Sequence, residues 1–111
     1  MAHRIATLGD ITSQFDVILS DVWGVLHNGV TAFPAAGVAL AEARKNGKTV
    51  VLITNSPRPA IGVIPQLRAL GVPDEAYDRI VTSGDVTREL IAEGPKKVFL
   101  LGPERDMPLF D

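Results

Sequence analysis

Short runs of hydrophobic residues recur along the chain and are separated by longer segments of mixed character. Four of these runs are rich in Val, Ile and Leu without alternation, which is typical of strands buried on both faces of a parallel sheet. They are Asp16–Leu19 with an extension to Leu26, Thr49–Ile53, Arg79–Val81 and Val98–Leu101. We therefore expect four parallel strands.

Segments of helical length lie between the predicted strands and carry residues that start and stop helices. The three segments are Ala35–Asn46, Ala60–Leu70 and Asp85–Glu93. The first has Pro34 at its start and Gly47 just past its end, a usual arrangement for a helix. The second contains Pro65, so it either begins late or is kinked. The third has Ser83 or Asp85 as its expected N-cap.

Strands that alternate with helices indicate βαβ crossovers and an open parallel sheet. The predicted fold class is therefore three-layer α/β, with helices flanking the sheet. At 111 residues the chain has the length of one domain. We expect residues 1–111 to form a single core domain or the N-terminal portion of one, with residues 1–14 as a lead-in segment.

Composition narrows the classes of function and partner. The net charge is −2 with no block of like charges, which argues against nucleic-acid and membrane partners. No Cys is present, so disulfides and thiolate-bound metals are excluded. The chain shows neither the apolar core of a signal peptide nor a run long enough to span a bilayer, so we expect a cytoplasmic protein.

Polar residues follow the predicted strands where ligands bind in such sheets, beyond the carboxyl ends. Asp21 follows the first strand, and Thr54, Asn55 and Ser56 end the second. Small hydroxyls, free N–H groups and a helix start favour an anion, most plausibly phosphate. A carboxylate beside phosphate repels it unless a cation bridges the two or the carboxylate attacks phosphorus. Asp21 is thus placed where a nucleophile or a metal ligand would be useful.

Each of these residues also has an ordinary structural interpretation. A lone Asp at a strand end, such as Asp21, is usually a turn or cap residue. The cluster Thr54–Ser56 could be a loop that caps the next helix. Asn28-Gly29 is a common tight-turn pair, and we interpret His27 as an exposed loop residue. Trp23 is more typical of packing than of binding.

The joint pattern is more specific than its parts. DVWGVLHNG at 21–29, VVLITNSPRP at 50–59 and IVTSGDVTREL at 80–90 together resemble the haloacid dehalogenase (HAD) superfamily of phosphohydrolases, and within it the NagD-like subgroup. The resemblance covers residues 15–102. It implies a Rossmann-like core, a Mg²⁺ cofactor, and hydrolysis of a small phosphorylated metabolite through an aspartyl-phosphate intermediate.

The resemblance also assigns roles to single residues. Asp21 corresponds to the nucleophile and Mg²⁺ ligand, and the backbone carbonyl of Trp23 to a second metal contact. Gly24 would let the chain turn away from the site. Thr54 and Asn55 would hold the transferring phosphoryl group.

Two departures from the family pattern stand out. Trp23 occupies the place where most members carry a second Asp that protonates the leaving oxygen, and an indole cannot deliver that proton at neutral pH. Such general acid help is worth about 10²- to 10⁴-fold, so esters with poor leaving groups should react slowly. The later Lys or Arg motif and the acidic pair have no match. We therefore infer a resemblance to the N-terminal part of a longer phosphatase, without its cap domain and last core strands.

Other functions remain as alternatives. A non-catalytic phosphate-ligand-binding or interaction module would keep the fold without turnover. A signalling receiver domain needs an acidic pair after strand one and an Asp ending strand three, but only Asp21 and Thr82-Ser83 stand there. A dinucleotide-binding domain would need a Gly-x-Gly-x-x-Gly motif, which is absent. An incomplete sheet would leave an open edge, so we also consider a homo-oligomer.

Overall fold

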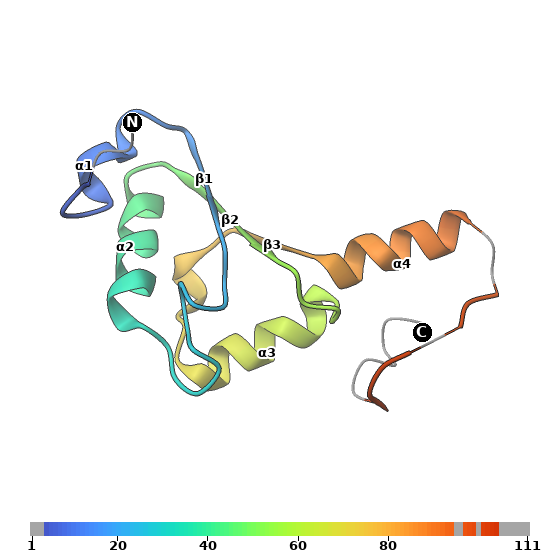
Figure 1. Cartoon of the computed structure of the whole chain (residues 1–111). Coiled ribbons are helices and arrows are strands. Elements are labelled where there is room, and N and C mark those ends of the chain that lie inside the picture. The colour runs from blue at the N-terminus through green and yellow to red at the C-terminus, as the bar shows by residue number, and fades with distance from the viewer. Residues whose placement is uncertain (1–3, 95–96, 100, 105–111) are drawn as a thin grey trace.

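The computed structural model describes residues 4–94, 97–99 and 101–104. Its elements are, in chain order, α1 (Gly9–Thr12), β1 (Val17–Ser20), α2 (Pro34–Lys45), β2 (Thr49–Thr54), α3 (Ala60–Leu70), the 3₁₀ helix η1 (Asp74–Ala76), β3 (Arg79–Thr82) and α4 (Ser83–Glu93). The strands form one parallel sheet in the order β1-β2-β3 (Figure 1). The predicted α/β fold, with a parallel sheet flanked by helices, is confirmed.

The carboxyl ends of the three strands meet at one edge of the sheet. Ser20 of β1 lies beside Leu52 of β2, and Thr54 of β2 lies beside Thr82 of β3. The loops that follow the strands therefore leave the sheet next to one another.

Helices α2 and α3 cover one face of the sheet. Because β1, β2 and β3 lie side by side in chain order and crossovers of this kind are right-handed, both helices fall on the same side, as Figure 1 shows. The core between them and the sheet includes Leu26, Leu40, Val50, Leu52 and Leu67, each at most 5% exposed.

The opposite face of the sheet is uncovered in the part of the chain that the structure describes. Four hydrophobic side chains on it, Val17, Leu19, Ile53 and Val81, are 43–64% exposed, and we call them the open face. Along each strand they alternate with the residues that pack under α2 and α3. Helix α4 extends away from β3 in Figure 1. The structure thus describes two of the three predicted layers.

Most helix boundaries agree with the prediction, but the capping of α4 differs. Pro65 lies inside α3, which runs from Ala60 to Leu70, so the helix does not begin late. The N-cap of α4 is Thr82 rather than Ser83 or Asp85, since the Thr82 Oγ1 accepts a hydrogen bond from the Asp85 N–H at 2.9 Å. The carboxylate of Asp85 instead accepts from the N–H of Ala60, the first residue of α3, at 2.8 Å.

Two predicted strand segments are wrong. The extension of β1 to Leu26 does not form, because the chain turns after the strand: the Leu26 N–H donates to the Val22 carbonyl at 2.8 Å, and Gly24 has a φ of +83°. In the predicted strand Val98–Leu101, Leu100 lies outside the described residues. The other three belong to no strand and are at least 47% exposed. A strand needs a neighbour to satisfy its backbone groups, and none of the described strands pairs with this segment.

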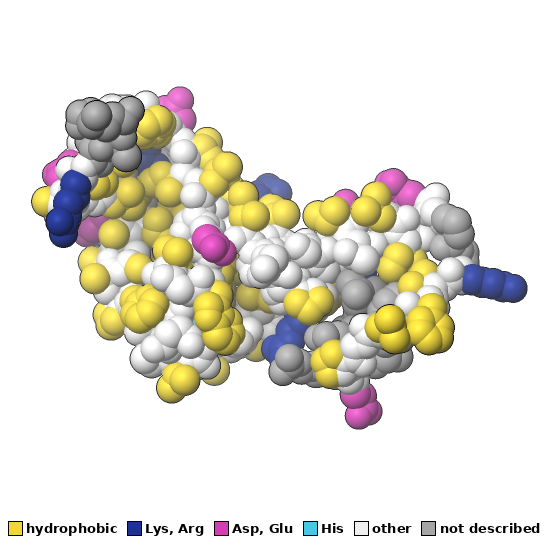
Figure 2. Space-filling model, in the orientation of Figure 1, with side chains coloured by type: hydrophobic (Ala, Val, Ile, Leu, Met, Phe, Trp, Pro, Cys, Tyr) yellow, Lys and Arg dark blue, Asp and Glu magenta, His cyan; other side chains and the backbone are white. Residues whose placement is uncertain are grey.

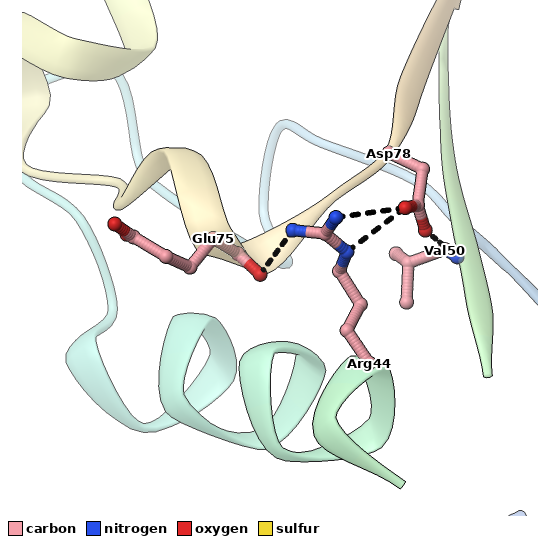
Figure 3. A network of polar contacts seen from close by, with 4 residues as sticks. All are labelled: Arg44, Val50, Glu75 and Asp78. Carbon is pink, nitrogen blue, oxygen red and sulfur yellow. Dashed lines mark hydrogen bonds and ion pairs between the residues drawn. The ribbon is translucent and has the colours of Figure 1, made fainter. Parts of the chain in front are cut away.

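A polar network ties α2, η1 and the start of β2 together (Figure 3). The carboxylate of Asp78 accepts a hydrogen bond from the Val50 N–H at 2.7 Å and pairs with the Arg44 guanidinium at 2.8 Å. Arg44 also donates to the carbonyl of Glu75 at 2.9 Å. These bonds hold the pKa of the Asp78 carboxyl below its usual range, with the Val50 N–H as the main cause and Arg44 as the next.

The surface carries no concentrated basic region on the side seen in Figure 2, where Lys and Arg side chains lie apart from one another among hydrophobic ones. Of the helices in the described parts of the chain, none has the length and hydrophobicity needed to cross a bilayer.

Candidate active site

Asp21 projects from the carboxyl end of β1 and is exposed. Its Oδ1 accepts a hydrogen bond from the Val22 N–H at 2.7 Å, which fixes the orientation of the carboxylate. The Oδ2 atom accepts no hydrogen bond from the described residues. Asp21 therefore presents one restrained oxygen and one available oxygen beyond the sheet.

The predicted phosphate cluster forms an ordered loop at the end of β2. The hydroxyl of Thr54 accepts from the Ser56 N–H at 3.2 Å, and the hydroxyl of Ser56 accepts from the Arg58 N–H at 3.2 Å. Thr54 is 9% exposed, whereas Asn55 is exposed. The two hydroxyls thus shape the loop, and Asn55 is the member of the cluster that projects to solvent.

Two neighbouring hollows bring the predicted residues together. The first, of about 530 Å³, is lined by Asp21, Trp23 and Asn55, with Ser20, Leu19 and Ile53. The second, of about 420 Å³, is lined by Trp23, His27, Thr54, Asn55, Ser56 and Arg58 among others. Trp23 and Asn55 border both hollows, so the nucleophile candidate and the phosphate cluster belong to one continuous region. Gly24 lines neither hollow and serves the turn described above.

The indole of Trp23 is exposed, but its position is defined by packing contacts. It is 63% exposed, and its benzene edge lies against Gly29, where an added Cβ would come within 2.3 Å of the indole Cη2. The other contact is with the His27 imidazole, at a centroid distance of 5.3 Å and an interplanar angle of 71°. Gly29 has a φ of +87°, which suits glycine and confirms the predicted turn at Asn28-Gly29.

The interpretation of His27 as an exposed loop residue is wrong, because it is 3% exposed. Its Nδ1 accepts a hydrogen bond from the Gly29 N–H at 2.9 Å, and its carbonyl accepts from the Gly24 N–H at 2.7 Å. Burial lowers the pKa of its imidazole. His27 thus joins both sides of the loop after β1, a role that the surrounding sequence does not indicate.

Gly84 and Asp85 hold the loop after β2 from outside, a role that their sequence context does not indicate. A Cβ at Gly84 would lie 2.2 Å from the Pro57 carbonyl oxygen, and its N–H donates to the Ser56 carbonyl at 3.0 Å. Asp85 caps α3 directly after the loop. Ser-Gly-Asp at 83–85 was the available signal, but it equally fits an ordinary helix start.

The oxygen donors at the site fit a hard divalent cation such as Mg²⁺. Asp21 offers a carboxylate oxygen, and the carbonyl of Trp23 accepts no hydrogen bond from the described residues, so it is available as a ligand. Mg²⁺ is commonly held by one or two carboxylates together with substrate phosphate and water. No group of three or more acidic, His or Cys side chains lies together within the described ranges, so Asp21 would be the one side-chain ligand supplied there.

Comparisons with known proteins agree with this arrangement. A family model described as Haloacid dehalogenase-like hydrolase matches residues 18–111. The chain is also similar to the crystal structure of a hydrolase of the haloacid dehalogenase-like family from Brucella suis 1330, with a TM-score of 0.90 and 56% sequence identity. That alignment covers 95% of this chain and 39% of the other, so the chain spans well under half the length of that structure.

No curated protein matches the chain. The family match includes Asp21 and the loop after β2, the residues that line the two hollows. The chain belongs to the haloacid dehalogenase-like hydrolase family.

Proposed function

We propose that this protein is a Mg²⁺-dependent phosphohydrolase that acts on a small phosphorylated metabolite through an aspartyl-phosphate intermediate. The observation that carries the proposal is the first hollow, which is lined by both Asp21 at the end of β1 and Asn55 at the end of β2. A carboxylate with an available oxygen thus lies beside an amide that can donate to phosphate.

The proposed reaction has two displacements at phosphorus. The Asp21 Oδ2 forms a bond to phosphorus while the bond to the leaving oxygen breaks, and the electron pair departs with that oxygen. Water then attacks the phosphorus of the aspartyl-phosphate, which releases inorganic phosphate and restores the carboxylate. Asn55 would donate to a phosphoryl oxygen in both steps, and Thr54 and Ser56 would keep its loop in place.

The cation would be held by the Asp21 carboxylate and the Trp23 carbonyl. When bound, Mg²⁺ offsets the negative charge that carboxylate and phosphate bring together. Asp21 Oδ1 would be the carboxylate oxygen at the cation, which leaves Oδ2 for the attack, and the Trp23 carbonyl accepts no hydrogen bond from the described residues.

Phosphate release from acetyl phosphate, with and without Mg²⁺, tests the proposal in the full natural protein. Acetyl phosphate has a leaving group that needs little protonation. We expect Mg²⁺-dependent release that is lost on chelation and that falls at least 10³-fold in Asp21→Asn, since the amide is no nucleophile.

Asp16→Asn is the matched control, because it makes the same change at the opposite end of β1, outside both hollows. It should retain the wild-type rate, and circular dichroism should show both variants folded. Turnover that persists in a folded Asp21→Asn protein would refute the nucleophile. A complete, folded protein without turnover, but with saturable Mg²⁺-dependent phosphate binding, would identify a binding module instead.

A further inference from the structure

The indole of Trp23 is a second feature of the site that indicates a bound ligand. Contact of an exposed tryptophan's apolar surface with water is unfavourable. The Trp23 indole is nevertheless held in a defined position by Gly29 on one side and His27 on another. It borders the hollow of Asp21 and the hollow of the phosphate loop. A rigid aromatic surface beside a nucleophile is suited to stacking against a flat group.

The lining of the two hollows also limits the leaving group. Among the described residues that line them, Asp21 is the one carboxylic acid, and it is assigned as nucleophile. The indole N–H of Trp23, the guanidinium of Arg58 and the amides of Asn55 and Gln66 do not release a proton at neutral pH. His27 also lines the second hollow, but it is buried, its Nδ1 accepts the Gly29 N–H, and burial lowers its pKa, which favours the neutral imidazole. These side chains therefore favour a leaving oxygen that is stable as an anion.

Phenols meet both conditions. A phenol has a pKa of about 10, far below the value of about 15.7 for water, which alkyl alcohols resemble. Its aromatic ring is flat and can stack on an indole. Acyl phosphates share the good leaving group but lack the ring, and alkyl phosphates lack both.

We propose that the site is selective for aryl phosphates, phosphate monoesters of phenolic or similarly acidic heteroaromatic hydroxyls, with the ring stacked on the Trp23 indole. This inference rests on the proposed function and specifies the substrate class of the same site. Asp21 Oδ2 would bond to phosphorus, the bond between phosphorus and the aryl oxygen would break, and the phenolate would leave with the electron pair and take a proton from water.

Kinetics on a pair of substrates test the selectivity in the full natural protein. The quantity to compare is the ratio of kcat/KM for phenyl phosphate to kcat/KM for acetyl phosphate. We expect Trp23→Leu to lower this ratio about tenfold, mainly through the KM of phenyl phosphate, and Trp23→Phe to restore most of it. Val30→Ala changes an exposed side chain that follows Gly29 in the sequence. This variant should leave the ratio unchanged.

A variant that moves the indole without removing it provides an independent check. In Gly29→Ala the new Cβ would overlap the indole Cη2, so the ring must shift, and the ratio should fall as in Trp23→Leu. An equal fall for both substrates in these variants would mean that Trp23 is structural and would overturn the inference.

Ligand binding separates failure of this inference from failure of the proposed function. Trp23 is the only tryptophan of the 111-residue chain. In this chain, tryptophan fluorescence therefore reports directly on a ring stacked on Trp23. With Mg²⁺ present, phenylphosphonate should bind about tenfold more tightly than methylphosphonate and should change the emission more strongly. Preferential binding without any turnover would refute the phosphohydrolase but support ring recognition. Turnover without a preference for the ring would refute ring recognition alone.

Discussion

At the scale of single residues, Gly84 shows how the position of a loop can depend on a missing side chain. The loop after β2 lies so close to the start of α4 that a Cβ at Gly84 would overlap the backbone of Pro57 and Arg58. Backbone atoms cannot rotate out of the way as a side chain end can. The residues that we assign to phosphate binding are therefore positioned in part by a glycine that touches no ligand.

Gly84→Ala should lower both stability and turnover. Overpacking of this kind costs about 1–3 kcal/mol, and the required shift would displace Asn55 from the hollow of Asp21. Urea denaturation measures the first effect, and kcat/KM for acetyl phosphate measures the second, where we expect a loss of about tenfold or more.

Gly62→Ala is the matched control for this substitution. Gly62 lies inside α3, where an added Cβ would make only ordinary contacts of 3.8–3.9 Å with Arg58. Alanine favours a helix over glycine by about 1 kcal/mol, so this variant should be at least as stable as the wild type. If both alanine variants behave alike, close packing at Gly84 does not position the loop.

At the scale of elements, Asp78 connects three parts of the chain that are separate in sequence. Through Val50 and Arg44 it joins the start of β2 and the end of α2 to the segment between η1 and β3 (Figure 3). The ionised carboxylate of Asp78 accepts the Val50 N–H and pairs with the Arg44 guanidinium. The stability of this corner should therefore depend on pH.

The sign of that dependence follows from the lowered pKa of Asp78 in the folded protein. An unfolded Asp has a pKa of about 3.9, so the contribution is fully present above about pH 4. It is lost as the pH falls through the lower pKa of the folded state, because protonation then favours unfolding. Asp78→Asn should be less stable than the wild type at pH 7, and the difference should shrink below pH 4.

Urea midpoints at pH 7, 4 and 3 measure this effect. Asp74→Asn serves as a control, since its pair with Arg68 joins two side chains that are both more than half exposed, and such pairs contribute little. A difference between Asp78→Asn and the wild type that stays constant from pH 7 to pH 3 would contradict the assigned linkage.

The elements that could be predicted from the sequence are those with strong local signals. Runs of Val, Ile and Leu located β1, β2 and β3, and the Pro34 and Gly47 pair located α2. The two wrong strand segments depended on distant partners: hydrophobic residues at Val98–Leu101 form a strand only beside another strand, and the turn at Gly24 interrupts the run after β1. Local composition does not reveal either condition.

The residues of the site likewise fall into those that could be predicted from the sequence and those that could not. Asp21 and Asn55 could be predicted because the carboxyl ends of parallel strands meet at one edge of the sheet. The burial of His27 and the packing of Trp23 against Gly29 could not be predicted, because they arise from how one loop folds back on itself. The sequence predicts Asp85 as a cap of its own helix, but its carboxylate accepts a hydrogen bond from the first residue of α3 instead.

At the scale of the whole molecule, the open face departs from an ordinary globular surface. Its four side chains are Val17, Leu19, Ile53 and Val81, and contiguous apolar surface of this kind usually binds something. We propose that the 111-residue chain, produced by itself, self-associates through this face.

Fluorescence of the dye ANS and sedimentation test that proposal. The 111-residue chain should bind ANS and sediment faster at high concentration, and the double variant Leu19→Gln with Val81→Thr should reduce both effects. Val38→Thr changes a single exposed residue of α2 and should alter neither. Equal ANS binding by all three proteins would show that the dye binds elsewhere.

The order β1-β2-β3 has a consequence for biosynthesis. Each strand pairs with the strand made just before it, so its partner has already been translated when it leaves the ribosome. Paired residues of neighbouring strands, such as Val17 with Thr49 and Val51 with Arg79, are closer in sequence than they would be in any other strand order, and domains generally fold in the direction of synthesis. The sheet that carries Asp21 and Asn55 can therefore assemble strand by strand during translation, whereas the loop after β2 reaches its final position only when Gly84 and Asp85 of α4 pack against it.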